Sequence, residues 1–410
     1  MIYDIGIIGA GASGMMAAVA AYREGLRICL FEHNDKPGKK ILVTGNGKCN
    51  ITNLNMTPEC YNSNSDGSYF SVIKNFGPSE LISFFKKIGL YTRDKDGYIY
   101  PFSEQAVSVL DALKNEISRL RIDLFTGINI KEIKKGFVIS SDKGEFNVRK
   151  LIIACGSKAM PVTGSDGSGY DFAKQFSHHI VDVIPALVQI KCREKFFKEL
   201  AGIRTKATVT VTDKAVKVVG DSGELQLTEY GISGIPVFQV SRHIKRLSDK
   251  GNDVKVHINF MPGYSTKTVK GMVHNIFSHN RKLDPVTALN GLLNKKLALV
   301  LVKNTTIDRG KSCGEITETQ TEELVKNIID FTVTPYDTNG FDNAQVCAGG
   351  VNLDEINLNT MESRLVKNLY FAGEILDVDG KCGGYNLQWA FSSGSVSYTH
   401  LRAHETPEHL

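Results

Sequence analysis

Residues 3–32, "YDIGIIGAGASGMMAAVAAYREGLRICLFE", contain an apolar run, a glycine-rich turn, a stretch of helix formers and a second apolar run. This order predicts one strand–helix–strand unit in about 30 residues. The turn follows the pattern G-x-G-x-x-G, whose glycines allow a tight turn, the approach of a pyrophosphate and close packing of helix on strand. The helix N-terminus then faces the phosphates, and an acid at the end of the second strand can bind a ribose hydroxyl. The residues expected at the dinucleotide are Gly9, Gly11, Ala12, Ser13, Gly14 and Glu32.

The length and composition predict two or three domains, because 410 residues, 42% of them hydrophobic, are enough for more than one core. No run approaches the ~20 consecutive apolar residues of a membrane span, and the N-terminus lacks the features of a signal peptide. The eight cysteines are scattered, without C-x-x-C pairs or metal-ligand spacing. We therefore expect a cytoplasmic protein with reduced thiols, no membrane association and no metal.

Charge is distributed unevenly along the chain. Between Lys191 and Lys311 there are 22 basic and 10 acidic residues, a net charge of +12, whereas the remainder holds 27 basic and 34 acidic residues, a net charge of −7. A basic segment within an acidic frame suggests a polyanionic partner. A lysine-rich, well-solvated surface explains the same count equally well, because the sequence does not show whether the charges share a face.

Changes in sequence texture predict a nucleotide-binding domain interrupted by an insert. Residues 1–187 and 336–394 alternate strand-like and helix-like stretches, as in an α/β fold. The insert, 188–335, begins with the β-branched alternation of a small β-barrel or antiparallel sheet (188–260) and continues with helices (about 261–330). The final stretch, 395–410, has no useful periodicity, and we expect it to be a non-native or disordered tail.

Three distant segments favour a flavin dinucleotide. Residues 151–161, "LIIACGSKAMP", resemble the second dinucleotide-binding segment of two-domain flavoproteins. Residues 368–380, "NLYFAGEILDVDG", resemble their late motif, in which an acid binds the ribityl chain of the flavin. Residues 383–394, "GGYNLQWAFSSG", open a helix whose N–H groups can stabilise negative charge on the reduced ring. The residues expected at the flavin are Ala154, Gly156, Gly373, Glu374, Gly383, Gly384, Tyr385 and Asn386.

Taken in order, these motifs resemble those of the YhiN/BaiN-like flavoproteins. The resemblance includes "GKKILVTGNGKCNITN", "DGYIYPFSEQAVSVLDAL", "GSDGSGYDFAKQFSHHI" and "GELQLTEYGISG", and it covers residues 3 to about 394. It departs at Cys155 and Ser157, where Thr and Gly are usual, and after Gly394, where the odd tail replaces a small-residue helix. The first departure leaves the backbone role intact, and the second puts the last helical turn in doubt.

The resemblance implies a Rossmann-like FAD-binding domain of the glutathione reductase type, with tightly held FAD. It also implies reduction of activated C=C bonds, with uridine in 23S ribosomal RNA or small oxo-enones such as bile-acid intermediates as substrates. A second G-x-G-x-x-G is missing after "LIIACG", so a separate nicotinamide domain is not expected. NAD(P)H, if it is the electron donor, must bind transiently near the flavin.

The loop "VTGNGKCNITN", residues 43–53, is expected to run along the FAD toward the flavin ring. Its glycines let backbone come close, its lysine balances phosphate or reduced-flavin charge, and its asparagines can bond ring or ribityl oxygens. The further residues expected at the cofactor are Lys40, Gly45, Asn46, Gly47, Lys48, Asn50 and Ile130.

Two cysteines are candidates for the proton donor. Hydride addition to one alkene carbon must be matched by a proton on its neighbour, and a positioned thiol can supply it. Cys49, in this loop, and Cys382, in "GKCGGYN", are the candidates, although a lone cysteine near a cofactor is more often a packing residue. Tyr98, Tyr100 and Ser103 in "GYIYPFSE" are candidates for the substrate face, with a core strand as the simpler interpretation.

The leading hypothesis is an FAD-dependent reductase of uridine in ribosomal RNA, because phosphate contacts dominate nucleic-acid affinity and the insert is basic. A reductase of small enones is the first alternative and predicts an apolar pocket with affinity insensitive to salt. A non-catalytic flavin-bound protein that binds RNA or senses redox state is the second. The oligomeric state is left open.

Overall fold

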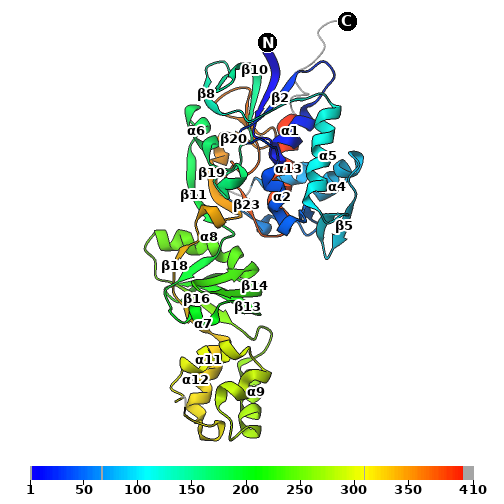
Figure 1. Ribbon diagram of the computed structural model, residues 1–410. Coiled ribbons are helices and arrows are strands. Elements are labelled where there is room, and N and C mark those ends of the chain that lie inside the picture. The colour runs from blue at the N-terminus through cyan, green and yellow to red at the C-terminus, as the bar shows by residue number, and fades with distance from the viewer. Residues whose placement is uncertain (1, 66–67, 309, 400–410) are drawn as a thin grey trace. The chain divides into compact units, whose positions relative to one another are not determined.

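The computed structural model describes residues 2–65, 68–308 and 310–399, which form two compact units (Figure 1). The first unit joins the chain up to Pro185 with the chain from Gln345 onward, and the second comprises Ala186–Ala344. The sequence predicts the return to the first unit at 336. Instead, β18 (Pro335–Thr338) pairs with β12 (Ile190–Cys192), and these strand hydrogen bonds keep 336–344 in the second unit.

A largely parallel sheet forms the centre of the first unit, in the order β20-β21-β22-β10-β1-β2-β7, and β9 and β8 extend it beside β10. β1 lies between β10 and β2 and runs parallel to both, so both of its edges are hydrogen-bonded. Its side chains are buried in two clusters, Ile5 and Ile7 in one and Tyr3 and Ile8 in the other. The strands are β1 (Ile2–Ile8), β2 (Ile28–Glu32), β7 (Asp123–Thr126), β8 (Ile130–Lys134), β9 (Val138–Ser141), β10 (Gly144–Ile153), β20 (Ile356–Asn357), β21 (Glu362–Ser363) and β22 (Leu369–Phe371).

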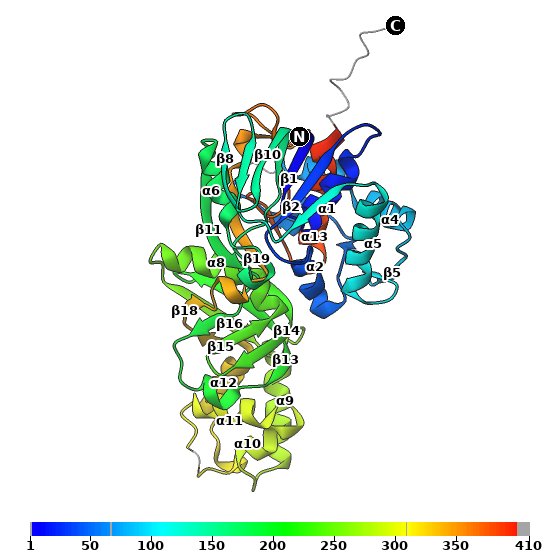
Figure 2. The same ribbon diagram turned by 45° about the horizontal axis from the view of Figure 1, so that its top comes forward.

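Two helices from opposite ends of the sequence, α1 (Ala12–Ala21) and α13 (Tyr385–Thr399), lie side by side in this unit (Figures 1 and 2). A Cβ on Gly394 would lie 2.5 Å from the carbonyl oxygen of Ser13, so only glycine fits at this contact. The predicted end of ordered structure at 394 is wrong, because α13 continues to Thr399 and buries Val396 in the core. The rest of the expected tail, 400–410, lies outside the described residues.

Smaller elements complete the first unit. A three-stranded sheet has the order β3-β6-β5, and β23 pairs with β4 and β11 with β19. Among the described residues, no helix has the length and apolar character needed to cross a membrane. The elements are α2 (Lys39–Val43), β3 (Thr52–Asn53), β4 (Tyr61–Asn62), α3 (Phe70–Asn75), α4 (Pro78–Lys87), β5 (Thr92–Lys95), β6 (Tyr98–Pro101), α5 (Ala106–Arg119), α6 (Ser168–Gln175), β11 (Ile180–Ala186), β19 (Val346–Val351) and β23 (Asp379–Gly380).

The sheet of the second unit closes on itself. Its order is β17-β16-β13-β14-β15-β12-β18. β17 (Phe331–Val333) pairs with β16 at one end of this order, β18 pairs with β12 at the other, and only Thr334 separates β17 from β18. One bent strand thus joins both edges, which gives the barrel-like sheet that the alternation predicts. The other strands are β13 (Arg204–Asp213), β14 (Val216–Thr228), β15 (Gly231–Gly234) and β16 (Val254–Asn259).

The β-rich part of the insert also contains a helix that the predicted texture does not include, α8 (Ile235–Asp249). Pro236 fits its first turn, and Val237, Val240 and Ile244 recur at helical spacing and are buried. β-branched residues alone therefore do not define a strand. The predicted helical part contains α9 (Thr266–His279), α10 (Pro285–Ala288), α11 (Lys295–Lys303) and α12 (Glu318–Ile329); α7 (Phe197–Leu200) precedes β13.

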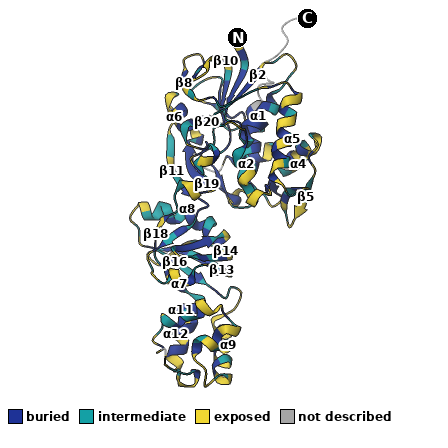
Figure 3. Cartoon of the chain, in the orientation of Figure 1, coloured by how far each residue is buried: buried dark blue, intermediate teal, exposed yellow. Residues whose placement is uncertain are grey.

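Each unit has its own hydrophobic core (Figure 3). The core of the second unit is built from β13, β14 and β16 together with α8, α9, α11 and α12. The first unit contains two clusters of buried residues, one of which includes the apolar residues of α1 and α5. Each unit therefore buries enough apolar surface to have a compact core of its own.

Candidate active site

The glycine turn after β1 excludes side chains at two positions and leaves a third open. A Cβ on Gly14 would lie 1.8 Å from the carbonyl oxygen of Gly9, and one on Gly9, whose φ is +105°, would lie 2.4 Å from the carbonyl oxygen of Ala154. Around Gly11, no described heavy atom beyond its own neighbours lies within 4 Å of such a Cβ. Gly11 also begins α1 without a side-chain cap. Helix N–H groups beside open space fit a pyrophosphate.

Glu32, at the end of β2, is held by three N–H donors. Its Oε2 accepts from the Ala10 backbone N–H at 3.1 Å, and its Oε1 accepts from the backbone N–H of Asn34 at 2.9 Å and from its Nδ2 at 2.8 Å. Oε2, which accepts only one of these bonds, still has a lone pair for a ribose hydroxyl. Asn34 is not among the predicted residues, but its place two residues after the acid is a signal that could have found it.

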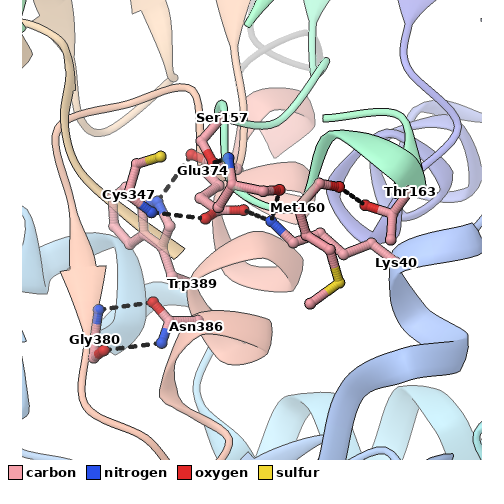
Figure 4. Close-up of polar contacts among 11 residues, drawn as sticks. Lys40, Ser157, Met160, Thr163, Cys347, Glu374, Gly380, Asn386 and Trp389 are labelled. Atoms are coloured by element: carbon pink, nitrogen blue, oxygen red, sulfur yellow. Dashed lines mark hydrogen bonds and ion pairs between the residues drawn. The ribbon is translucent and has the colours of Figure 1, made fainter. Parts of the chain in front are cut away.

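Lys40 and Glu374, both predicted at the cofactor, form a half-buried ion pair of 2.7 Å (Figure 4). Lys40 Nζ also donates to the carbonyl oxygen of Ala159 at 3.3 Å, and Glu374 Oε1 accepts from the Cys347 backbone N–H at 3.2 Å. Segments that contain Lys40, Ala159, Cys347 and Glu374 therefore meet at this ion pair. The contributions of Ala159 and Cys347 come from backbone groups, which leave no signal in a side-chain motif.

Two side chains of α13, Trp389 and Asn386, hold the preceding segment by hydrogen bonds to the backbone of Gly373 and Gly380. Trp389 Nε1 donates to the carbonyl oxygen of Gly373 at 3.0 Å. Asn386 Oδ1 accepts from the N–H of Gly380 and its Nδ2 donates to the same residue's carbonyl oxygen, both at 2.8 Å (Figure 4). The side chain of Asn386 is thus committed to the protein backbone, so it positions the turn rather than presenting its amide to a ligand.

The turn at Gly383 and Gly384 lies against the end of the loop "VTGNGKCNITN". A Cβ on Gly384, whose φ is +94°, would lie 2.6 Å from the carbonyl oxygen of Thr52. Asn53 Nδ2 donates to the carbonyl oxygen of Gly383 at 3.2 Å, and Thr52 Oγ1 donates to Gln388 Oε1 at 2.5 Å. The two segments that the sequence assigns to the flavin are therefore neighbours in space.

The tip of this loop is exposed and its base is buried. Residues 45–48 lie at the surface, and Lys48 Nζ pairs with Glu104 at 3.0 Å. Asn50 is buried, and within the described part of the chain no hydrogen-bond partner reaches its Oδ1, which lies 2.9 Å from a Cβ built on Gly384. A buried carbonyl oxygen without a donor costs free energy unless a ligand supplies one. Asn50 therefore fits its predicted place at the cofactor.

The two candidate cysteines differ in accessibility. Cys49 has an exposed fraction of 0%, its thiol packs in the core that contains Ile51, and its backbone N–H donates to Thr44. Burial raises its pKa to about 11. Protein atoms enclose this thiol, which argues against Cys49 as the proton donor, a role that stays a prediction. Cys382 is partly exposed, and burial raises its pKa above the ordinary value.

Two tyrosines of β6 lie near the turn that follows Cys382 and near the loop at Gly45. A Cβ on Gly383 would lie 2.8 Å from Cε1 of Tyr98, and one on Gly45 would lie 3.9 Å from Cε1 of Tyr100. Desolvation raises the pKa of Tyr100, and Tyr98 and Cys382 add to this shift. The interpretation of these tyrosines as core residues is wrong, since Tyr98 is exposed and Tyr100 partly exposed. Ser103 lies farther along at the surface, bonded to Ser108 at 2.8 Å.

Other predicted residues shape the site through the backbone or lie in the core. Gly156 lies two residues after Ala154 and has a φ of +77°. A Cβ on Gly156 would lie 2.9 Å from Ser165 Oγ. Tyr385 donates through its hydroxyl to the carbonyl oxygen of Asn55 at 3.1 Å and anchors the start of α13. Ile130 packs against the core, which argues against its expected contact with the cofactor.

Two buried polar groups near Glu374, Asp377 and Tyr170, are not among the predicted residues. Asp377 is fully buried; its Oδ2 accepts two N–H groups of Asn64 at 2.9 Å, while its Oδ1 finds no partner among the described residues. The hydroxyl of the buried Tyr170 is likewise without a partner in the part of the chain that the structure describes. Asp377 and Asp379 in "LDVDG" follow the predicted Glu374 within five residues. This cluster of acids is a signal that could have identified Asp377.

The arrangement fits a flavin dinucleotide: open backbone at Gly11, an acid at Glu32, and a buried acceptor at Asn50 next to a glycine turn. No group of three or more His, Cys, Asp or Glu side chains within the described ranges is placed to hold a metal ion. Comparison with known proteins gives a match of residues 3–399 to the family described as the HI0933-like protein Rossmann domain.

The chain belongs to this family. It is 43% identical to the 3-dehydro-bile acid delta(4,6)-reductase of Clostridium scindens, over 96% of this chain and 97% of that protein. It is 31% identical to the ribosomal RNA dihydrouridine synthase of Escherichia coli, over 95% of this chain and 96% of that protein. The resemblance to the YhiN/BaiN-like flavoproteins is thereby confirmed, and this member of the HI0933-like family is a flavin-dependent oxidoreductase.

Among solved structures, one match is the 3-ketosteroid-delta4-(5alpha)-dehydrogenase of Rhodococcus jostii. Its sequence identity is 12% and its TM-score 0.48, with 97% of this chain and 96% of that chain covered. Similarity at this level transfers no function.

Proposed function

We propose that this protein is an FAD-dependent reductase that adds a hydride and a proton across the activated C=C bond of uridine in ribosomal RNA. The observation that carries the chemistry is the place of Cys382. Cys382 is partly exposed and precedes the glycine turn that opens α13, where Tyr98 lies beside Gly383 and Asn50 beside Gly384. A reductase needs such a proton donor within reach of the substrate.

The residues that would hold FAD are those of the four segments described above. The α1 N-terminus at Gly11 would take the pyrophosphate, Glu32 a ribose, and Lys40 with Glu374 the chain that leads to the ring. Asn50 would receive a hydrogen bond at its orphaned Oδ1. Bound FAD supplies the hydride once it has been reduced, and NAD(P)H is the proposed donor of those electrons.

Cys382 would complete the reduction by giving a proton to the carbon next to the one that takes the hydride. The raised pKa keeps the thiol protonated at neutral pH, so the proton is present when it is needed. The thiolate left behind recovers a proton from solvent, and the substrate gains two hydrogens in total. Cys382 in turn adds to the raised pKa of the nearby Tyr100 hydroxyl.

RNA as the substrate is supported by charge and by one set of relatives. The second unit, 186–344, contains 23 basic and 17 acidic residues, a net charge of +6. This excess is smaller than the +12 of 191–311, because α12 brings acids such as Glu318 and Glu322, which both pair with Lys270. The remaining excess still favours a polyanion. A cytoplasmic location follows from this substrate.

A small oxo-enone is the second candidate substrate, and the higher identity to the bile acid reductase favours it. Such a substrate would use the same hydride and proton chemistry. It makes no use of a basic surface, so its KM should not depend on salt.

The experiment is dihydrouridine analysis by mass spectrometry. Unmodified bacterial large-subunit RNA is incubated without oxygen with the FAD-loaded protein and NADPH or NADH. A parallel reaction contains a 3-oxo-Δ4 steroid, and a third lacks enzyme. Dihydrouridine at a defined position supports the proposal. Steroid reduction without dihydrouridine, while the flavin is demonstrably reduced, overturns the RNA assignment in favour of the second candidate.

A further inference from the structure

The hairpin of β5 and β6 presents a row of aromatic and basic side chains on one face. Tyr91, just before β5, is 64% exposed, Tyr98 is 41% exposed and Phe102, just after β6, is 61% exposed. Aromatic side chains in contact with water forgo the favourable free energy of burial. Three of them exposed on one hairpin therefore indicate a surface that binds a partner.

The strand register explains why these side chains share a face. Arg93 stands opposite Tyr100 and Lys95 opposite Tyr98, and the N–H of Phe102 bonds to the carbonyl oxygen of Tyr91 at 2.8 Å. Cross-strand partners point to the same side, and side chains two residues apart along a strand do so too. The hairpin face is therefore defined by Tyr91, Arg93, Lys95, Tyr98, Tyr100 and Phe102.

The opposite side of the hairpin is buried, which fixes the orientation. Ile99 and Pro101 alternate with the exposed tyrosines, and both are buried. A one-residue slip would expose Ile99 and bury the tyrosines, so the core specifies this register. The aromatic row faces outward because the fold holds it there.

Cations accompany the rings. The guanidinium carbon of Arg93 lies 4.3 Å from the ring centroid of Phe102, and Arg93 Nη1 bonds to Glu104 Oε1 at 3.1 Å. Glu104 also pairs with Lys48 of the loop. Arginine stacked on an aromatic ring is a platform for a nucleobase, and basic groups beside it suit the phosphates that accompany each base.

The hairpin face is continuous with the candidate site. Tyr98 packs beside Gly383, and Asn53 of β3 pairs with Tyr98 in the same small sheet. The row of rings thus begins at the turn that carries Cys382 and runs away from it toward Tyr91. A chain of unstacked bases that entered the site at Cys382 would continue along this row.

We propose that the hairpin face binds the unpaired nucleobases that flank the target uridine, each base stacking on a ring while Arg93 and Lys95 contact phosphates. This inference rests on the proposed function. A steroid would use one or two rings and no cations, whereas single-stranded RNA uses both.

The test measures RNA binding separately from reduction. Fluorescence anisotropy with a labelled single-stranded oligouridylate, and with a duplex RNA of equal length, is recorded for the FAD-loaded protein and for the variants Tyr91→Ala, Phe102→Ala and Lys95→Ala. Tyr264→Ala, an exposed tyrosine of the second unit, is the matched control. The flavin spectrum and melting temperature check that each variant is folded and loaded.

We expect each aromatic variant to weaken single-strand binding by roughly 5- to 100-fold. Lys95→Ala should lower the salt dependence of binding, and the control should bind as the parent does. Unchanged binding in all three hairpin variants overturns this inference, even if the protein forms dihydrouridine. Absence of dihydrouridine alongside hairpin-dependent RNA binding would instead reject the reductase assignment and leave the binding surface in place.

Discussion

Lys40 Nζ lies 2.7 Å from Oε2 of Glu374, a contact between residues 334 positions apart in the sequence. The pair ties the segment after β2 to the segment after β22, and the Cys347 backbone N–H completes the shell of Glu374. It is the point where the two ends of the first unit are held together beside the expected cofactor site.

Removing one partner of this pair should cost more than removing both. Glu374→Gln leaves the Lys40 ammonium half-buried without its counter-charge, and we expect a loss of about 1–3 kcal/mol in unfolding free energy together with weaker FAD retention. The double variant Lys40→Met/Glu374→Gln should recover part of the stability but not the FAD. Urea unfolding and the ratio of FAD to protein measure the two effects. Additive losses in the double variant would mean that the residues are not coupled.

Two glycines of the same turn should respond oppositely to alanine. Gly14→Ala places a methyl group 1.8 Å from the Gly9 carbonyl oxygen, so we expect failure to fold. Gly11→Ala meets open space, so the protein should fold with the melting temperature of the FAD-free parent and lose FAD affinity. Circular dichroism and flavin content separate the two results. Full FAD content in Gly11→Ala would place the pyrophosphate elsewhere.

Alanine variants of Cys382 and Cys49 should differ in their effects on turnover and on stability. Cys382→Ala should lower turnover by roughly 100-fold with little change in stability, because it removes a proton donor. Cys49→Ala should destabilise the protein by about 1 kcal/mol and leave turnover per bound FAD unchanged, because it removes a packed core group. Single-turnover oxidation of the reduced enzyme by substrate reports the rate.

The pH dependence of that rate provides a further check on Cys382. Its pKa is raised from 9.0, so a rate that depends on the thiol should persist through neutral pH and fall only above pH 9. Loss of this alkaline decline in Cys382→Ser would agree with the thiol as donor. An unchanged profile in that variant would point to another acid.

His178 should govern the acid stability of the first unit without taking part in the reaction. Its ring is buried between Glu355 (Nδ1 to Oε2, 2.9 Å) and Ser363 (Nε2 to Oγ, 2.8 Å), and desolvation lowers its pKa from 6.5. The unfolded chain binds a proton there at a higher pH than the folded chain, so stability should fall as the pH drops below 6.5. Melting temperatures from pH 7 to 5 measure this, and the slope should shrink in His178→Gln.

That variant also tests the appearance of a catalytic triad. Ser363, His178 and Glu355 are linked by hydrogen bonds in that order, as in a triad. His178 and Ser363 are buried, and Ser363 Oγ accepts from a backbone N–H, so turnover per bound FAD should not change in His178→Gln. A large fall in turnover would contradict a purely structural role.

Local rules account for the elements whose formation depends on nearby residues. The βαβ unit of residues 3–32, the glycine turn and the acid at its end follow from spacing alone. The domain boundary and the helix α8 do not follow from local rules. The boundary depends on β18 pairing with a strand more than a hundred residues earlier, and α8 forms where the barrel buries the apolar face of that helix. The last turns of α13 were also missed, since their polar and small residues gain order by packing rather than by propensity.

The sequence by itself determined an α/β fold with a dinucleotide-binding unit, because glycines that permit close backbone contact and acids at fixed offsets are local requirements of binding a dinucleotide. The order of its motifs carried the resemblance to its family. Only the tertiary structure decided which cysteine is accessible and which rings face outward. Cys49 and Cys382 have the same chemistry and similar glycine-rich neighbours. Burial in a core assembled from distant segments encloses one of them, and the register of a small sheet sets the other beside exposed tyrosines.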